Sequence, residues 1–421
     1  MILAVVLFVA MYVLMIAFSK FRPYIALGFA LLFSVLGIVA PENILPSINW
    51  NVLMMIAGTM VVVDSFIASK MPDRIADILL EKASNVMWVT IYMSLFSGIV
   101  SAFIDNVATV LMVAPVGIAI CKKLKISPVA MILCIAVSSN LQGAATLVGD
   151  TTSIMLGAYA NMDFNSFFWM NGRPGIFFAV ELGALATVPI MMFLFRNNKE
   201  PVSSDHRTKV EDVVPSFLLI GIVVTLILAS FVPNKPGITN GLICITYAVI
   251  SIVYRYIRTR DIKTVTTTIR TLDYPTLLLL TGLFIVIEGI TEAGVIDAIA
   301  GWIASVGGSN IFLLYTIIVW GSVAASAFID NIPYVATMLP VLTGVTATLG
   351  MEPYLLYFGL LSGATLGGNI TPIGASANIT AVGMLRKEGE EVSFPTFMKI
   401  GVPFTLAAVL AGYIYLWLVW R

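Results

Sequence analysis

The hexapeptide Ser101-Ala102-Phe103-Ile104-Asp105-Asn106 occurs twice, because the same six residues return unchanged as Ser326-Ala327-Phe328-Ile329-Asp330-Asn331. Each copy places a carboxylate and an amide inside an apolar run, where ionisable groups are costly and are read as functional by default. The two copies are separated by 225 residues (330 − 105), and the chain therefore contains two related halves. The same spacing relates Pro115 to Pro340, Gly143 to Gly368, Thr146 to Thr371, Gly149 to Gly374 and Ile154 to Ile379.

The composition is that of a membrane protein. Of the 421 residues, 59% are hydrophobic and 11% are charged, and the mean hydropathy of +0.99 is far above that of soluble domains. The 23 basic and 23 acidic residues balance, so the charge gives no indication of a nucleic-acid partner. We expect the lipid bilayer to be the surrounding partner of an all-α polytopic fold.

The apolar segments predict ten transmembrane spans, two re-entrant hairpins and two broken helices. The hairpins are expected at residues 85–125 and 310–349, each made of two half-helices with its Asp-Asn pair at the tip near the middle of the membrane. Irregular backbone at that depth is tolerated only where it is buried or lines a cavity. The broken helices are expected at residues 126–159 and 353–385, where glycines and hydroxyl residues interrupt apolar runs, as in many transporters.

The halves form an inverted repeat in this interpretation. They occupy residues 1–195 and 212–421, joined by a hydrophilic linker at 196–211 that we expect in the cytoplasm, with His206 solvated. If both termini lie outside, the inner loops hold 20 of the 23 lysines and arginines, Lys20 and Arg22 among them. This is the bias that the positive-inside rule demands.

The hairpin tips are the predicted cation sites. At such a tip, unpaired carbonyls and unpaired amides of two helix ends point into one small volume. Asp105 and Asp330 add negative charge suited to Na⁺ or a proton, while Asn106 and Asn331 both donate and accept hydrogen bonds. We predict that Asp105 and Asp330 bind the coupling cation, with Na⁺ as a candidate metal ion at these two residues and at Asn106 and Asn331. The residues predicted to line the substrate pocket between the tips are Asn106, Asn331, Thr146 and Thr371. The alternative is that each pair merely caps a helix.

The polar residues of the broken helices are predicted to complete two sites, or alternatively to be small residues that pack helices in lipid. Asp150 has no acidic counterpart, because Ala375 stands in its place, so the two sites are chemically unequal and Asp150 is a candidate proton carrier. Functional and paired structural roles stay equally open for Asp64, Glu181 and Glu288. Beyond the tips, the predicted site residues are Asn140, Thr146, Gly149, Asp150, Thr151, Asn369, Thr371, Gly374, Ser376 and Asn378.

The two motifs resemble the ion transporter superfamily, and within it the branch of arsenite permeases, the P protein and D-type sodium/proton antiporters, with a citrate-transporter-like domain. The resemblance is carried by SAFIDNVAT at 101–109 and GGNITPIGASAN at 367–378. It implies a homodimer in which a scaffold stays still while an elevator-type transport domain, carrying both hairpins, moves. Dicarboxylate carriers of the superfamily have Ser-Asn-Thr at each tip, where this chain has Asp-Asn-Val at 105–107 and Asp-Asn-Ile at 330–332.

The leading hypothesis is a secondary active transporter, coupled to H⁺ or Na⁺, that moves a small inorganic anion or a metalloid such as arsenite across a prokaryotic inner membrane. The alternatives are a Na⁺/H⁺ antiporter without an anion substrate and a Na⁺-coupled carboxylate carrier. No cofactor is expected besides the coupling ion. An enzyme is disfavoured because the sequence contains no HExxH motif, nucleophile elbow or glycine-rich phosphate loop.

Overall fold

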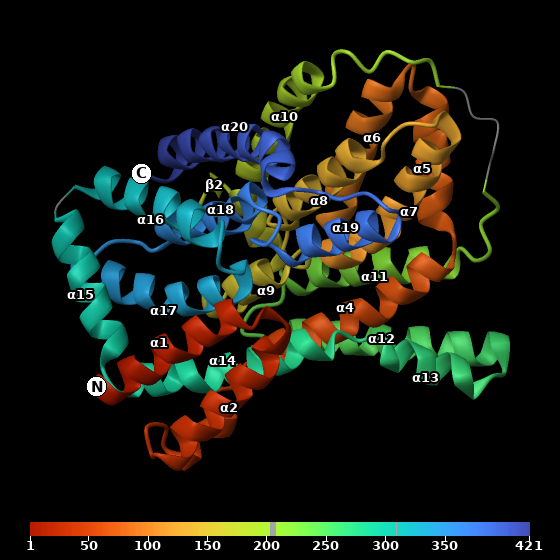
Figure 1. The fold of residues 1–421 in the computed structure, drawn as a ribbon. Coiled ribbons are helices and arrows are strands. Elements are labelled where there is room, and N and C mark those ends of the chain that lie inside the picture. Colours follow the sequence, from red (N-terminus) through yellow and green to blue (C-terminus); the bar gives the residue numbers. More distant parts are fainter. Residues whose placement is uncertain (203–207, 309) are drawn as a thin grey trace.

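The computed structural model describes residues 1–202, 208–308 and 310–421, and this part of the chain is almost entirely helical (Figure 1). The first repeat contains α1 (Ile2–Ala17), η1 (Ser19–Phe21), α2 (Arg22–Val35), η2 (Pro41–Asn43), α3 (Ile44–Ser47), α4 (Trp50–Ala68), α5 (Met71–Lys82), α6 (Val86–Ser101), α7 (Asn106–Leu124), α8 (Val129–Gly143), α9 (Thr151–Tyr159), η3 (Phe164–Phe167) and α10 (Ile176–Leu194). The second contains α11 (Val214–Ala229), α12 (Thr239–Thr259), α13 (Ile262–Arg270), α14 (Tyr274–Glu292), α15 (Val295–Gly307), α16 (Ile311–Ser326), α17 (Asn331–Leu349), α18 (Tyr354–Gly367), η4 (Gly368–Ile370), α19 (Ser376–Lys387) and α20 (Phe394–Trp420).

The predicted membrane architecture is confirmed. In the described part of the chain, seven helical segments are long and apolar enough to cross a membrane, and the shorter apolar helices include α1, α2 and α11. The ten expected spans fall on α1, α2, α4, α8 with α9, α10, α11, α12, α14, α18 with α19, and α20. Five residues of the linker, 203–207, and with them His206, lie outside the described residues.

Both hairpins form, but their arms are longer than the predicted half-helices. The chain turns after α6 and α16, which have 16 residues each, and returns in α7 and α17, which have 19 residues each. A helix of 19 residues rises about 28 Å, so these returning arms cover most of the thickness of a bilayer. Figure 1 shows the two hairpins entering from opposite ends of the molecule, with their tips meeting near its centre.

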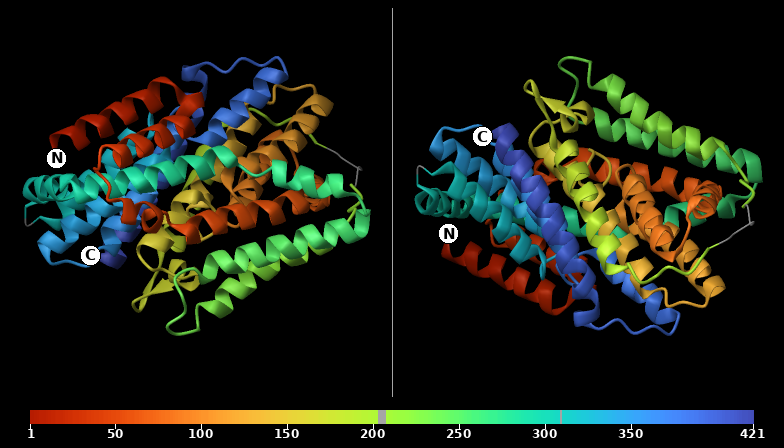
Figure 2. Two further views of the ribbon diagram at one scale, coloured as in Figure 1. Left: turned by 90° about the horizontal axis from the view of Figure 1, so that it is seen from below. Right: turned by 90° about the horizontal axis from the view of Figure 1, so that it is seen from above.

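The two repeats are interlocked by an exchange of helices. α2 of the first repeat packs along α14 of the second, and α4 packs along α12 in the equivalent way. The amphipathic helices α5 and α15 lie at opposite ends of the molecule (Figures 1 and 2). Each repeat therefore supplies part of the support for the other, and the tips are held between them.

One small β-hairpin departs from the all-α expectation. Strands β1 (Trp169–Met170) and β2 (Arg173–Pro174) pair antiparallel, and both turn residues, Asn171 and Gly172, have positive φ angles. Asn-Gly between two short strands is the strongest local hairpin signal. The sequence therefore contained the information for this element.

Candidate functional site

Each hairpin tip is bound to the broken helix of its own half. The hydroxyl of Thr146 donates to the carbonyl oxygen of Ala102, and that of Thr371 donates to the carbonyl oxygen of Ala327. The predicted equivalence of the two halves thus extends to individual hydrogen bonds. Each threonine thus connects a hairpin tip to the interruption of the broken helix in the same half, so that the hairpin and the broken helix form one unit.

The first residue of the repeated hexapeptide carries an unsatisfied hydroxyl in both halves. Ser101 and Ser326 are 0% exposed, and neither hydroxyl oxygen has a hydrogen-bond partner in the described part of the protein. Buried polar atoms are nearly always satisfied. The two hydroxyls thus match each other at equivalent positions of the two tips.

Four asparagines connect the first tip to both broken helices. Asn106 at the tip donates to Asn140 on α8 over 2.8 Å. The amide nitrogen of Asn140 donates in turn to Asn369 at 2.8 Å and to Asn378 at 3.0 Å. All four side chains are buried. The network brings together four predicted site residues from α7, α8, η4 and α19.

Asp150, which was predicted to belong to the site of the first half, is hydrogen-bonded to the tip of the second hairpin. Its carboxylate accepts hydrogen bonds from Thr152 at 3.0 Å and from Asn331 at 3.4 Å. The residue is 2% exposed. No basic side chain pairs with Asp150 in the described ranges. Thr151, the first residue of α9, is buried beside it.

The two tip aspartates have different surroundings. Asp105 accepts from the backbone amides of Val107 and Ala108, and its side chain opens onto a cavity of about 510 Å³ that is also lined by Asp64 and Asp273. Asp105 has no basic partner among the residues that the structure covers. Its charge is therefore available to a cation that reaches this cavity.

Asp330 already has a cationic partner. Nη1 of Arg22 donates to its Oδ2 at 2.9 Å, and Ser376 donates to the same oxygen at 3.1 Å. Arg22 is the first residue of α2 and reaches a hairpin tip, and its place in an inner loop stays a prediction.

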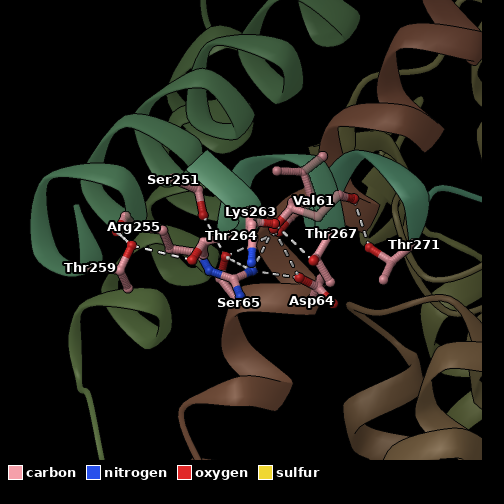
Figure 3. Close-up of polar contacts among 11 residues, drawn as sticks. Val61, Asp64, Ser65, Ser251, Arg255, Thr259, Lys263, Thr264, Thr267 and Thr271 are labelled. Atoms are coloured by element: carbon pink, nitrogen blue, oxygen red, sulfur yellow. Dashed lines mark hydrogen bonds and ion pairs between the residues drawn. The ribbon is translucent and has the colours of Figure 1, made fainter. Parts of the chain in front are cut away.

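The remaining acidic residues divide into two kinds. Asp64 is paired with Arg255 (Figure 3). Arg255 also donates to Thr268 at 2.7 Å. This network joins α4, α12 and α13 and gives Asp64 a structural partner. Glu181 on α10 and Glu288 on α14 are partly buried and have no hydrogen bond or ion pair within the described ranges.

We expect Asp64→Asn to lower the free energy of unfolding by about 1 kcal/mol, because the Asp64–Arg255 pair is partly exposed and such pairs contribute little. Urea titration of the detergent-solubilised protein measures this. Arg386→Gln is the control, since Arg386 is exposed at the end of α19 and has no ion pair in the described part of the chain. A loss for Asp64→Asn no larger than that of the control would contradict the structural role.

Sequence reasoning missed Arg22 and the two orphaned serines as members of the site. The serines could have been found, because they open the hexapeptide that the chain repeats. Gly149 and Gly374 are brought to the tips, where each packs against tip carbonyls. Among the predicted site residues, the structure thus clusters the tip residues, the broken-helix asparagines and threonines, Asp150 and Ser376.

Comparison with known proteins agrees with this architecture. Residues 10–363 match the model of a family described as "Citrate transporter". An uncharacterized transporter of Mycobacterium tuberculosis is 31% identical over 99% of this chain and 98% of its own length. The human P protein is 25% identical over 88% of this chain and 53% of its own length.

Two solved structures share the fold. The Alcanivorax borkumensis YdaH transporter has a TM-score of 0.62 at 13% identity and covers 95% of this chain and 97% of that chain. MtrF of Neisseria gonorrhoeae, described as one of a class of antimetabolite efflux pumps, has a TM-score of 0.61 at 16% identity and covers 93% of this chain and 84% of that chain. At these identities the likeness concerns the fold alone.

Proposed function

Because this chain belongs to the citrate transporter family and is a membrane transporter, we propose that it is a secondary active transporter coupled to H⁺ or Na⁺. The observation that carries the proposal is the pair of carboxylates of Asp105, at the first tip, and Asp150, in the first broken helix, neither of which has a basic partner in the described ranges. An uncompensated charge inside a membrane protein is costly. A mobile cation that binds there supplies the missing compensation.

In this proposal the coupling cation binds at the first tip. Asp105 receives it from the cavity that Asp64 and Asp273 also line, and Asp150 serves as the second carboxylate or as the proton carrier. Ser101, Thr146 and the tip carbonyls are oxygen ligands of the kind that Na⁺ prefers. Asn106 and Asn140 link this tip by hydrogen bonds to Asn369 and Asn378 of the second broken helix. Cation binding at the first tip is thereby coupled to the position of the second broken helix.

The cargo in the leading proposal is a small inorganic anion or a metalloid such as arsenite. A carboxylate is the second candidate, and it is favoured by the description of the matching family as citrate transporters. The asparagines and threonines around the tips are able to donate to oxygens of either kind of solute.

We further propose a homodimer in a prokaryotic inner membrane, with a moving transport part and with both termini outside. Both termini lie at the same end of the molecule (Figure 1), which agrees with an even number of crossings. Accessibility of single cysteines introduced near residues 2 and 421 to an impermeant reagent on intact cells tests the orientation.

Proteoliposome uptake tests the coupling. An imposed Na⁺ or H⁺ gradient is expected to drive accumulation of one member of a panel of arsenite, sulfate and citrate against its own gradient. Collapse of the gradient with the matching ionophore should abolish accumulation. Dequenching of a pH dye upon Na⁺ addition without any anion would instead select the Na⁺/H⁺ antiporter, and failure of every gradient to move any solute would refute secondary transport by this protein.

A further inference from the structure

A second cavity, of about 340 Å³, lies against the tip of the second hairpin and differs in charge from the cavity at the first tip. Two of its lining residues are basic and one is acidic, and the rest are neutral. The polar lining consists of Lys20, Arg22, Tyr24, Tyr274, Thr276, Asp330 and Ser376. The lining of the first cavity contains Asp64, Asp105 and Asp273 and no basic residue. The molecule thus presents an acidic cavity at one tip and a basic cavity at the other.

Four helix N-termini meet at the basic cavity. Its lining includes the first residues of α2, α14 and α19 and the N-cap of α17. The N-terminus of a helix carries a partial positive charge and unpaired amide donors. Asp273 and Asp330 cap two of these ends, whereas no side chain caps α2 or α19. This arrangement reinforces the charge of Lys20 and Arg22.

Arg22 has hydrogen-bonding capacity to spare. Its side chain is only 14% exposed, and in the described structure it donates from Nε to the carbonyl of Met15 at 3.3 Å and from Nη1 to Asp330. A guanidinium carries five N–H donors, so most of them lack a protein acceptor. A planar group with free donors beside a cavity is suited to bidentate binding of an oxyanion.

We propose that this cavity is an anion site, in which Arg22 and Lys20 bind a small oxyanion with the hydroxyl of Ser376 nearby. The inference rests on the proposed function and deepens it by assigning the substrate to the second tip, where a cation at Asp330 accompanies it in addition to the cation at the first tip. Lys20 lies at the exposed mouth of the cavity and attracts the anion. Arg22 holds it at depth.

The Arg22–Asp330 pair explains how the anion and the cation depend on each other. When the oxyanion binds the guanidinium of Arg22, Asp330 loses its ion-pair partner. A buried charge without a partner is strongly unfavourable. A cation at Asp330 restores the balance, just as Asp330 balances Arg22 when the cavity is empty of anion. Anion and cation are therefore bound together or not at all, which is the requirement for symport.

Ligand-dependent thermal stabilisation of the purified full-length protein tests the proposal with citrate, succinate, sulfate, phosphate and arsenite in the presence of Na⁺. At least one of the charged oxyanions is expected to stabilise the wild type. Lys20→Gln should weaken that binding about tenfold, as expected for the loss of one charged contact. Arg22→Gln should abolish it. The carboxylates and the inorganic oxyanions form separate arms, so the result also identifies the chemical source of the oxyanion.

Because Arg22→Gln leaves Asp330 unpaired and the variant could fail to fold, the double variant Arg22→Gln/Asp330→Asn removes both charges together. It should fold and bind none of the oxyanions, whereas Arg386→Gln should bind like the wild type. Unchanged oxyanion affinity in the double variant would overturn the proposal, as would a wild type that none of the charged oxyanions stabilises. The inference and the proposed function can fail separately. If Asp105→Asn loses coupled flux while the Arg22 variants bind the oxyanion unchanged, the inference is refuted and the proposed function is supported.

Discussion

Asp105→Asn is expected to abolish cation-coupled transport while leaving the fold intact. Asp105 caps α7 through the amides of Val107 and Ala108, and asparagine is as good an N-cap as aspartate, so the hairpin should still form. What the substitution removes is the negative charge that faces the cavity. A charged contact with a partly desolvated cation is worth about 3 kcal/mol, so we expect the apparent affinity for the coupling cation to fall about 100-fold.

Asp273→Asn provides a matched control for this experiment. Asp273 is also a helix N-cap, accepting from the amide of Thr276 at the start of α14, and it lines the same cavity as Asp105. The Asp273→Asn substitution removes one negative charge from the same cavity and leaves the residues of the hairpin tip unchanged. Gradient-driven uptake in proteoliposomes should be lost for Asp105→Asn and reduced only slightly for Asp273→Asn. Equal losses would show that the cavity's total charge matters rather than the tip, and full activity of Asp105→Asn would remove the assignment.

The sequence was sufficient to predict the elements that depend on local and repeated patterns. The repeated hexapeptide identified both hairpin tips, and the polar residues within apolar runs identified both broken helices. Both signals are local features of the sequence and need no knowledge of tertiary contacts. Asn106, Asn140, Asn369 and Asn378 were all predicted as site residues, and the structure joins them. Their mutual pairing was not predicted, because it depends on how the halves interlock.

The Arg22–Asp330 pair could not have been predicted from these patterns, because it joins residues 308 positions apart. It also breaks the symmetry of the repeat. A spacing of 225 residues places Tyr247 where Arg22 would recur, so the second half has no copy that could reveal the role of Arg22. Comparison of the two halves therefore identifies the tips but cannot identify Arg22, which makes the two tips unequal.

Gly149→Ala is expected to cause the largest loss of stability among single substitutions at the site. A Cβ atom at this position would lie 2.5 Å from the carbonyl oxygen of Gly143, 2.7 Å from that of Ser101 and 2.8 Å from that of Ala102. All three atoms belong to the backbone, two at the tip and one at the end of α8, so the clash can be relieved only by shifting the backbone of both the tip and the broken helix. Overpacking of this kind costs about 3 kcal/mol, and it would also pull Thr146 from the carbonyl to which it donates.

Gly374→Ala should repeat the effect at the second tip, because its Cβ would lie 2.6 Å from the carbonyl oxygen of Gly368 and 2.7 Å from that of Ser326. Gly383→Ala is the control: no atom lies within 4 Å of its added Cβ, and alanine within α19 should stabilise the helix by about 1 kcal/mol. Urea titration in detergent measures all three free energies of unfolding. If each break holds its own tip, the first two variants lose similar stability and the control loses none. A wild-type stability for Gly149→Ala would mean that tip and break are not packed as one unit, and the coupling route from Asp105 through Asn140 would lose its physical basis.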